Sequence, residues 1–308
     1  MSAQRVAVVQ AGSTMFNTPQ TLEHMQAQCE ELRRLGVQVG VFPEAYIGGY
    51  PKGLDFGARV GSRSPAGRED FRRYWSAAIE VPGPETRQIG DLAKFAGTYL
   101  VVGVIERAGG TLYCTALFFD PQGALMGKHR KLVPTASERL IWGMGDGSTM
   151  PVLDTSAGRI GAVICWENYM PALRMSMYAK GIQLWCAPTV DEREIWQSSM
   201  RHIAYEGRCF VLSACQYLKR SDCPADYACI QGDAPETELI RGGSVIVNPL
   251  GEVLAGPVYG REVILTADID LADTVRGKYD LDVTGHYARP EVFSLIVDER
   301  EKRPVRSS

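Results

Sequence analysis

Short apolar runs of strand length alternate with longer amphipathic runs along almost the whole chain, and this alternation constrains the fold more than any other feature. Residues 37–42 read VQVGVF and place valines on one face, whereas residues 18–35 have helical spacing and begin with Thr-Pro, which favours a helix start. No linker and no internal repeat of roughly 20 to 50 residues divides the chain. The pattern predicts one sheet-based α/β domain over residues 1–308, with a charged, flexible tail at 298–308.

Further segments of both kinds are predicted from the same patterns. Residues 48–67 and 219–241 are rich in turn-forming and charged residues and are expected to be loops, and the first either covers or borders a site or is a passive surface loop. The expected strands are 6–11, 37–42, 99–106, 111–120, 124–128, 160–164, 182–187, 208–214, 244–248, 253–256 and 263–268. The expected helices are 18–35, 71–78, 85–96, 169–180, 195–206 and a short one from Leu271.

Composition and charge narrow the class of partner. The chain has 308 residues, of which 45% are hydrophobic and 22% charged, so it can bury a large core. Its net charge is only -3 and no basic block occurs, which argues against nucleic acid and membrane partners and leaves a small molecule. No run approaches the roughly 18 to 20 apolar residues of a membrane span, and the N-terminus lacks signal-peptide features. We therefore expect a soluble, cytoplasmic protein.

The cysteines and histidines show no metal-binding or disulfide pattern. Eight cysteines are spread over a long chain with no C-x-x-C pair, and the four histidines form no H-E-x-x-H motif. Most of the thiols are expected to be reduced and buried. The dinucleotide, P-loop and serine-hydrolase motifs are also missing from the sequence, so we expect no metal and no organic cofactor.

One cysteine stands out because of where its strand ends. The apolar run 160–164 has the length and branched composition of a buried strand, and residues 169–180 then have helical spacing. Cys165 lies at the corner between them. Ligands meet open α/β sheets at the carboxyl ends of strands, so this thiol is a candidate nucleophile. A small buried core thiol is the alternative, and it is the commoner role of a cysteine.

A base and a cation for this thiol come from two other segments. Glu44 is the first polar residue after the predicted strand 37–42, and two such corners of one sheet can converge in space. Lys131 lies in a basic cluster flanked by apolar residues, and a buried lysine needs a carboxylate partner, for which Glu138 is the nearest candidate. A carboxylate can deprotonate the thiol, and an ammonium favours the thiolate and stabilises negative charge on the substrate.

Three segments that carry these residues resemble the signature segments of the nitrilases, within the carbon-nitrogen hydrolase superfamily. They read FPEAYIGGYPKG, HRKLVPTASERLIWGMGDGS and ICWENYMPALR. The resemblance runs almost end to end, is weakest over residues 223–241, and points to the branch of plant and bacterial nitrilases. It implies that Glu44 is the general base, Lys131 stabilises the tetrahedral species, Cys165 is the nucleophile and Glu138 is an additional active-site carboxylate.

The same resemblance implies a fold, an assembly and an activity. The fold would be a four-layer αββα sandwich, and the assembly a homo-oligomer that forms spirals or filaments. The activity would be hydrolysis of an organic nitrile to the acid and ammonia through a thioimidate and a thioester, without a cofactor. The alternatives are an amidase or carbamoylase of the same superfamily and a non-catalytic assembly protein, but CWEN and ERLIWGMGDGS favour a nitrilase.

Aromatic residues flank the predicted catalytic positions and are candidates for the wall of an apolar substrate pocket. These are Trp166, Tyr50, Trp142 and Tyr169, and the alternative role for each is core packing. Trp166 directly follows the predicted nucleophile and is the preferred pocket residue. Glu167 and Asn168 are expected to cap the following helix rather than to take part in catalysis.

Overall fold

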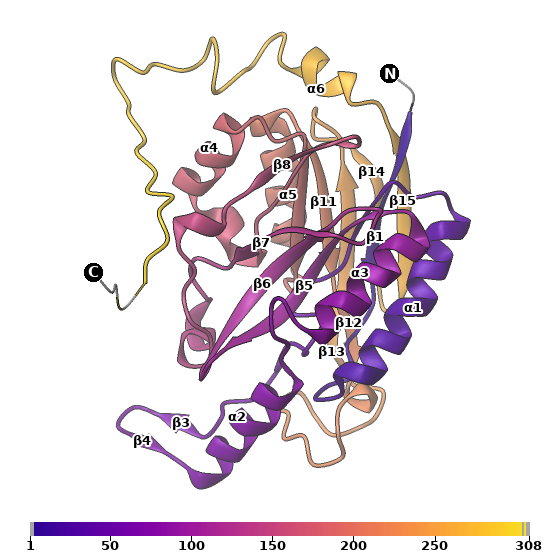
Figure 1. Cartoon of the computed structure of the whole chain (residues 1–308), viewed down its shortest axis with the longest axis vertical. Helices are drawn as coiled ribbons and strands as arrows, with labels where there is room; N and C mark the ends of the chain where they lie inside the picture. Colours follow the sequence, from indigo (N-terminus) through magenta and orange to yellow (C-terminus); the bar gives the residue numbers. More distant parts are fainter. Residues whose placement is uncertain (1–2, 304, 306–308) are drawn as a thin grey trace.

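The computed structural model describes residues 3–303 and 305, which form two β-sheets that face each other (Figure 1). One sheet has six strands in the order β15-β1-β2-β5-β6-β7, and the other has seven in the order β12-β13-β11-β10-β9-β8, with β14 also paired to β13. The strands of the first sheet are β1 (Gln4–Gln10), β2 (Val39–Val41), β5 (Tyr99–Ala108), β6 (Thr111–Phe119), β7 (Leu125–Arg130) and β15 (Val263–Ile269). Those of the second are β8 (Val152–Thr155), β9 (Gly158–Ala162), β10 (Leu184–Thr189), β11 (Phe210–Cys215), β12 (Tyr217–Lys219), β13 (Glu238–Val247) and β14 (Val253–Tyr259).

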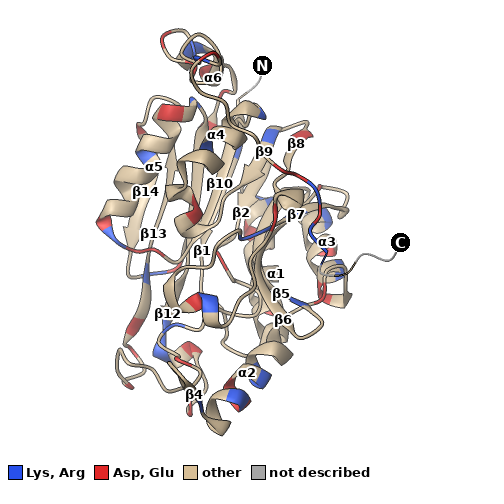
Figure 2. Cartoon of the chain, turned by 90° about the vertical axis from the view of Figure 1, so that its left-hand side faces the viewer, with Lys and Arg blue, Asp and Glu red and all other residues tan. Residues whose placement is uncertain are grey.

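Helices cover the outer face of each sheet. Helices α1 and α3 pack on the first sheet, and helices α4 and α5 pack on the second (Figures 1 and 2). The helices are α1 (Thr18–Arg34), α2 (Pro65–Ala77), α3 (Pro84–Ala96), α4 (Pro171–Ala179), α5 (Glu194–Gly207) and α6 (Ala272–Gly277). The layers therefore follow the order αββα, and the predicted four-layer sandwich is confirmed.

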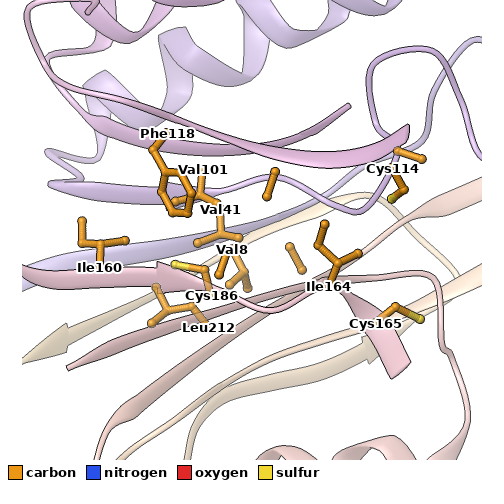
Figure 3. Close-up of a cluster of buried hydrophobic side chains, with 14 of the residues drawn as sticks. Val8, Val41, Val101, Cys114, Phe118, Ile160, Ile164, Cys165, Cys186 and Leu212 are labelled. Carbon is orange, nitrogen blue, oxygen red and sulfur yellow. The ribbon is translucent and has the colours of Figure 1, made fainter. Parts of the chain in front are cut away.

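The alternation of side chains along each strand explains why the layers stack in this way. On β1, Val6 and Val8 point into the core between the sheets, whereas Ala7 and Val9 pack against the helices on the other side. Strands buried on both faces read as continuous apolar runs. Figure 3 shows the core between the sheets, with residues of both sheets meeting at Val8, Val41, Val101, Phe118, Ile160, Cys186 and Leu212. Cys114 and Cys165 lie at one end of this core.

Both predicted loops contain regular structure, so those predictions were wrong in part. Residues 48–67 include the hairpin of β3 (Ala58–Arg59) and β4 (Ser62–Arg63) and the start of α2. Helix α2 begins at Pro65 because the Ser64 side chain accepts from the N–H of Gly67 and caps it. Residues 219–241 include the end of β12, the 3-10 helix η4 (Arg220–Asp222) and the start of β13. Strand β8 was not predicted.

The end of the chain runs as an extended segment along the outside of the sandwich (Figure 1). Residues 298–303 form no helix or strand, and the N–H of Lys302 donates to Asp146. Residues 304 and 306–308 of the predicted flexible tail lie outside the described residues, and the flexibility stays a prediction.

Two further properties concern the whole of the described chain. None of its helices is long and apolar enough to cross a membrane. All eight cysteines fall within the described residues and are unpaired, and all but the half-buried Cys229 are buried, as predicted.

Candidate active site

The two predicted corners belong to different sheets. Glu44 follows β2 of the first sheet, whereas Cys165 follows β9 of the second. The expectation that they lie on one sheet was wrong, because the chain passes to the second sheet after β7. The corners nevertheless meet across the interface between the sheets, where the charge of Glu44 acts on the Cys165 thiol.

Backbone geometry fixes the turn that carries Glu44. Gly103 on β5 leaves room for this turn, since a Cβ there would lie 2.1 Å from the carbonyl oxygen of Pro43. Ala45 has a left-handed conformation with φ of 52°, which is uncommon for a residue with a side chain and is often found at functional sites. From the facing sheet, the Gln216 side chain donates to the carbonyl of Glu44 at 2.7 Å. Both sheets therefore hold the Glu44 backbone in place.

Lys131 lies between two carboxylates directly after β7. Its Nζ donates to Glu44 Oε1 at 2.7 Å and to Glu138 Oε2 at 2.8 Å, and its side chain is fully buried. The predicted contact between Lys131 and Glu138 is thus confirmed. Glu138 also accepts from the hydroxyl of Tyr50 at 2.8 Å and from the N–H of Thr135 at 2.6 Å. Charged residues are seen on many helices and loops in Figure 2, whereas Lys131 and Glu44 are buried inside the sandwich.

Burial and charge shift the ionisation of both partners of this ion pair. Burial raises the pKa of the Glu44 carboxyl, and Lys131 only partly opposes this effect. Burial alone would lower the pKa of Lys131, but the charge of Glu44 and the neighbouring acidic groups raise it well above its ordinary value. Lys131 therefore stays an ammonium at neutral pH.

The two oxygens of Glu44 have different surroundings. Oε1 accepts from Lys131 and, at 3.5 Å, from the thiol of Cys114. Oε2 is buried and has no hydrogen-bond partner in the described part of the chain. A buried acceptor without a partner is costly, so such an atom needs an explanation. Oε2 is therefore the oxygen available to take a proton.

Cys165 occupies a strained position at the start of the 3-10 helix η3 (Cys165–Tyr169). Its φ is 50°, a left-handed conformation that is unfavourable for a residue with a side chain. The hydroxyl of Thr189 donates to its Sγ at 3.3 Å. Burial and the charge of Glu44 raise the pKa of the thiol, while Lys131 and Thr189 oppose that shift. The thiol is therefore neutral at neutral pH and needs a base before it can attack.

A cavity of about 220 Å³ opens in front of this thiol. It is lined by Tyr50, Lys52, Thr135, Glu138, Cys165, Trp166, Val190, Asp191, Glu192 and Arg193. Two of the predicted pocket residues, Trp166 and Tyr50, are thus in its wall. A second cavity of about 400 Å³ shares Tyr50, Lys52 and Glu138 with it.

The other two predicted pocket residues lie outside the lining of the first cavity. Trp142 is buried, its ring is 5.4 Å from Nζ of Lys131, and it lines the second cavity. Tyr169 packs edge-on against Trp166, with ring centroids 5.9 Å apart. Tyr169 therefore supports the ring that faces the cavity.

The sequence did not single out Thr189, which contacts Cys165, or Asp191 and Arg193, which line the cavity. Thr189 ends β10, although the predicted strand 182–187 stops before Pro188. Asp191 accepts from the indole N–H of Trp166 at 2.8 Å and pairs with Arg193, whose guanidinium lies 4.8 Å from the Trp166 ring. Their position just after a strand end was the available signal, because strand ends carry ligand sites in this class of fold.

Glu167 and Asn168 hold the Cys165 turn. Glu167 Oε2 accepts from the N–H of Ile164 at 2.9 Å, and the Asn168 amide donates to the carbonyl of Cys165 at 2.8 Å. The expected capping role thus applies to η3 rather than to α4, which has no side-chain cap. Within residues 3–303 and 305, no group of three or more His, Cys, Asp or Glu side chains could hold a metal ion.

Comparisons with known proteins agree with this geometry. Residues 5–279 match the carbon-nitrogen hydrolase family. A nitrilase of Bradyrhizobium diazoefficiens is 60% identical over 98% of this chain and 94% of its own length, and an aliphatic nitrilase of Sinorhizobium fredii is 56% identical over 99% of both chains. A bifunctional nitrilase/nitrile hydratase of Lupinus angustifolius is 54% identical over 98% of this chain and 88% of its own.

Solved structures show the same fold at low sequence identity. The NitFhit protein of C. elegans is 19% identical with a TM-score of 0.76, over 99% of this chain and 69% of its own. Nit3 of Saccharomyces cerevisiae is 21% identical with a TM-score of 0.70, over 92% of this chain and 96% of its own. The chain therefore belongs to the carbon-nitrogen hydrolase family, on the branch that contains plant and bacterial nitrilases.

Proposed function

We propose that this chain hydrolyses an organic nitrile to the carboxylic acid and ammonia through a covalent bond to Cys165. The observation that carries the proposal is the ammonium of Lys131, which is buried between Glu44 and Glu138 beside a neutral thiol. A buried cation beside a nucleophile stabilises negative charge as it develops on the substrate. The high identity to bacterial and plant nitrilases supports a nitrile as the substrate.

In the first half of the proposed reaction, Glu44 Oε2 takes the proton of the Cys165 thiol. The sulfur then forms a bond to the nitrile carbon, and one π bond of the C≡N group breaks as the nitrogen takes from Glu44 the proton that came from the thiol, which returns Glu44 to a carboxylate. The product is a thioimidate. Lys131 stabilises the charge that develops on nitrogen.

In the second half, one water molecule adds to the thioimidate carbon, and ammonia leaves to give a thioester. A second water molecule, deprotonated by Glu44, attacks the thioester carbon, and the C–S bond breaks. The carboxylic acid is released and the thiol regains its proton. Two water molecules are consumed for each nitrile, and the site returns to its starting state without a metal or an organic cofactor.

The pocket that we propose for the substituent is the cavity beside Trp166 and Tyr50. Its wall combines these two rings with charged residues at the mouth, among them Lys52 and Arg193. Small-ligand sites are commonly apolar with a few convergent polar groups. Trp142 and Tyr169 support the pocket from behind in this proposal, Trp142 beside Lys131 and Tyr169 against Trp166.

The test is an ammonia-release assay over a panel of aliphatic and aromatic nitriles and their amides, with the acid and any amide product measured together. Cys165→Ala and Glu44→Gln should each abolish release while circular dichroism shows an intact fold. Activity like that of the wild type in either variant would refute the assignment. Release from the amides alone would identify an amidase or carbamoylase. A Cys165 that alkylates no faster than a free thiol, with no release at all, would support a non-catalytic assembly protein.

We further propose that residues 1–308 act as one catalytic domain that assembles with copies of itself, as spirals or filaments, in the cytoplasm. The large apolar side chains of Ile195 and Tyr205 are exposed on α5 and would be available for a contact with another copy. Unpaired cysteines agree with a reducing compartment. Light scattering and electron microscopy of the purified protein test the assembly, and a monodisperse monomer would refute it.

A further inference from the structure

A second buried ion pair joins the two segments that carry Lys131 and Cys165. His129 lies two positions before Lys131 on β7, and Glu167 lies two positions after Cys165 in η3. Both side chains are almost fully buried, and His129 Nε2 is 2.9 Å from Glu167 Oε2. Since β7 belongs to the first sheet and η3 follows β9 of the second, this contact crosses the interface between the sheets.

Glu167 also binds the backbone on both sides of that interface. Its Oε1 accepts from the N–H of Leu132 at 2.5 Å, next to Lys131. Its Oε2 accepts from the N–H of Ile164 at 2.9 Å, next to Cys165. One carboxylate therefore binds the residues adjacent to both proposed catalytic groups.

The contacts of His129 determine how many protons the pair holds. Its Nδ1 is 2.7 Å from the carbonyl oxygen of Thr149, which can only accept, so Nδ1 carries a hydrogen. Its Nε2 faces a carboxylate, and a hydrogen bond there needs a second proton, on either Nε2 or Glu167. If that proton is lost, two acceptors face each other in a buried site. The intact contact therefore depends on one shared proton.

We propose that His129 and Glu167 are positioning residues, a buried clamp that holds the Lys131 segment against the Cys165 turn by sharing one proton. The inference rests on the proposed function, because it assigns the two residues a task in that reaction. Neither residue lines the cavity in front of Cys165, so they act through the groups that they hold. Displacement of a reacting group by about 1 Å can lower a rate by about a hundredfold.

The clamp should respond to pH in a definite direction. The groups that face His129 are Glu167, the carbonyl of Thr149 and the ammonium of Lys180. Burial alone would lower the pKa of His129 and so would Lys180, but Glu167 and the Thr149 carbonyl raise it above its ordinary value of 6.5. Because the pKa is raised in the folded protein, the clamp is complete below about pH 6.5 and is lost as the pH rises through the raised pKa.

Two substitutions at His129 distinguish a role in positioning through hydrogen bonds from a role in packing alone. In His129→Gln the amide nitrogen takes the place of Nε2, so it can donate to Glu167 without a titrating proton. In His129→Asn the amide nitrogen takes the place of Nδ1, so it can donate to Thr149 but leaves Glu167 without its partner. His24→Asn is the matched control, because His24 on helix α1 pairs with Glu262 at 3.2 Å, away from the proposed catalytic groups.

The three variants and the wild type are compared by kcat and KM for a nitrile between pH 5 and 10, by the rate of Cys165 alkylation with iodoacetamide, and by urea unfolding. We expect kcat of His129→Asn to fall about a hundredfold with little change in KM, and its Cys165 to alkylate at an altered rate. The kcat of His129→Gln should stay within about tenfold of the wild type. In the wild type, kcat should decline as the pH rises through the raised pKa of His129, and His129→Gln should lose this alkaline decline. His24→Asn should match the wild type.

Each outcome decides for or against the clamp. Equal kcat values for His129→Asn and His129→Gln would overturn it, as would an alkaline decline in His129→Gln identical to that of the wild type. The second criterion holds even if His129→Asn fails to fold. If the wild type hydrolyses no nitrile, the proposed function fails by itself. The alkylation rates as a function of pH then still test whether His129 positions the thiol: identical profiles for the wild type and His129→Gln would overturn the clamp.

Discussion

Replacement of Lys131 by methionine tests whether the buried cation is needed by the fold, by the reaction, or by both. The substitution keeps the length of the side chain and removes the charge that lies 2.7 Å from Glu44 and 2.8 Å from Glu138. Glu138 would keep hydrogen bonds from the Tyr50 hydroxyl and the Thr135 N–H. Glu44 would keep only the weak thiol donor of Cys114. Most of the cost should therefore fall on Glu44.

The size of that cost follows from the burial of Glu44. Removal of one partner of a buried ion pair lowers the free energy of unfolding by about 3–5 kcal/mol, because it leaves an uncompensated charge. We expect a loss in this range for Lys131→Met at pH 7. The loss should shrink by up to about 1.4 kcal/mol for each pH unit between the pKa of Glu44 in the variant and its lower pKa in the wild type, since the protonated carboxyl carries no charge to bury. Catalysis should fall at least about a hundredfold.

The assay is urea unfolding at fixed protein concentration, at pH 5 and pH 7, for Lys131→Met, Glu44→Gln and the double variant. The double variant removes both charges, so it should be about 2 kcal/mol more stable than Lys131→Met at pH 7 and equally inactive. A double variant that is less stable than Lys131→Met would refute the reasoning. A Lys131→Met enzyme that keeps a tenth or more of the wild-type kcat would show that charge on the substrate is stabilised elsewhere.

Three more predictions concern the groups around the thiol. Burial raises the pKa of Glu44 above its ordinary value of 4.5. Because a base must be deprotonated, kcat/KM should fall as the pH drops through this raised pKa. A fall of kcat/KM that occurs only at or below pH 4.5 would contradict the role of Glu44. Cys114→Ala removes the thiol that donates to Glu44 and should lower kcat/KM about fivefold, the equivalent of about 1 kcal/mol, whereas Cys114→Ser should stay near the wild type. Thr189→Val removes the hydroxyl that donates to Cys165 Sγ and should lower both the alkylation rate of Cys165 and kcat/KM about tenfold. Thr189→Ser keeps the hydroxyl and should retain both rates. Equal rates for the two Thr189 variants would exclude a role for the hydroxyl.

Much of the fold could be predicted from local patterns. Strands β1, β5 and β6 have apolar runs of a characteristic length, and helices α1 and α3 have a regular apolar face, so their places in the chain were clear. Strand β8 (VLDT) is short and only half-buried, so its pattern is weak. The start of α2 lies in a loop-like stretch, where the cap residue Ser64 and the following Pro65 were the available signals.

The site could be predicted only as a set of residues, because its assembly depends on contacts between distant segments. Lys131 and Glu138 are seven positions apart, and their contact followed from the need of a buried lysine for a carboxylate. The sheet to which each corner belongs was not encoded locally, so Glu44 and Cys165 were expected on one sheet. Thr189 falls outside the predicted strand 182–187 because proline disfavours the interior of a strand, whereas β10 runs through Pro188.

The division of the site between two sheets explains why its support must cross the interface between them. The first sheet supplies Glu44 and Lys131, and the second supplies Cys165. Each sheet alone would hold either the proposed base without the proposed nucleophile or a neutral thiol without its proposed base. Their relative position is set by apolar packing, which is strong but lacks direction. A buried hydrogen bond tolerates little change in distance or angle. Directional contacts across the interface, such as that between His129 and Glu167, can therefore fix the position of one sheet relative to the other.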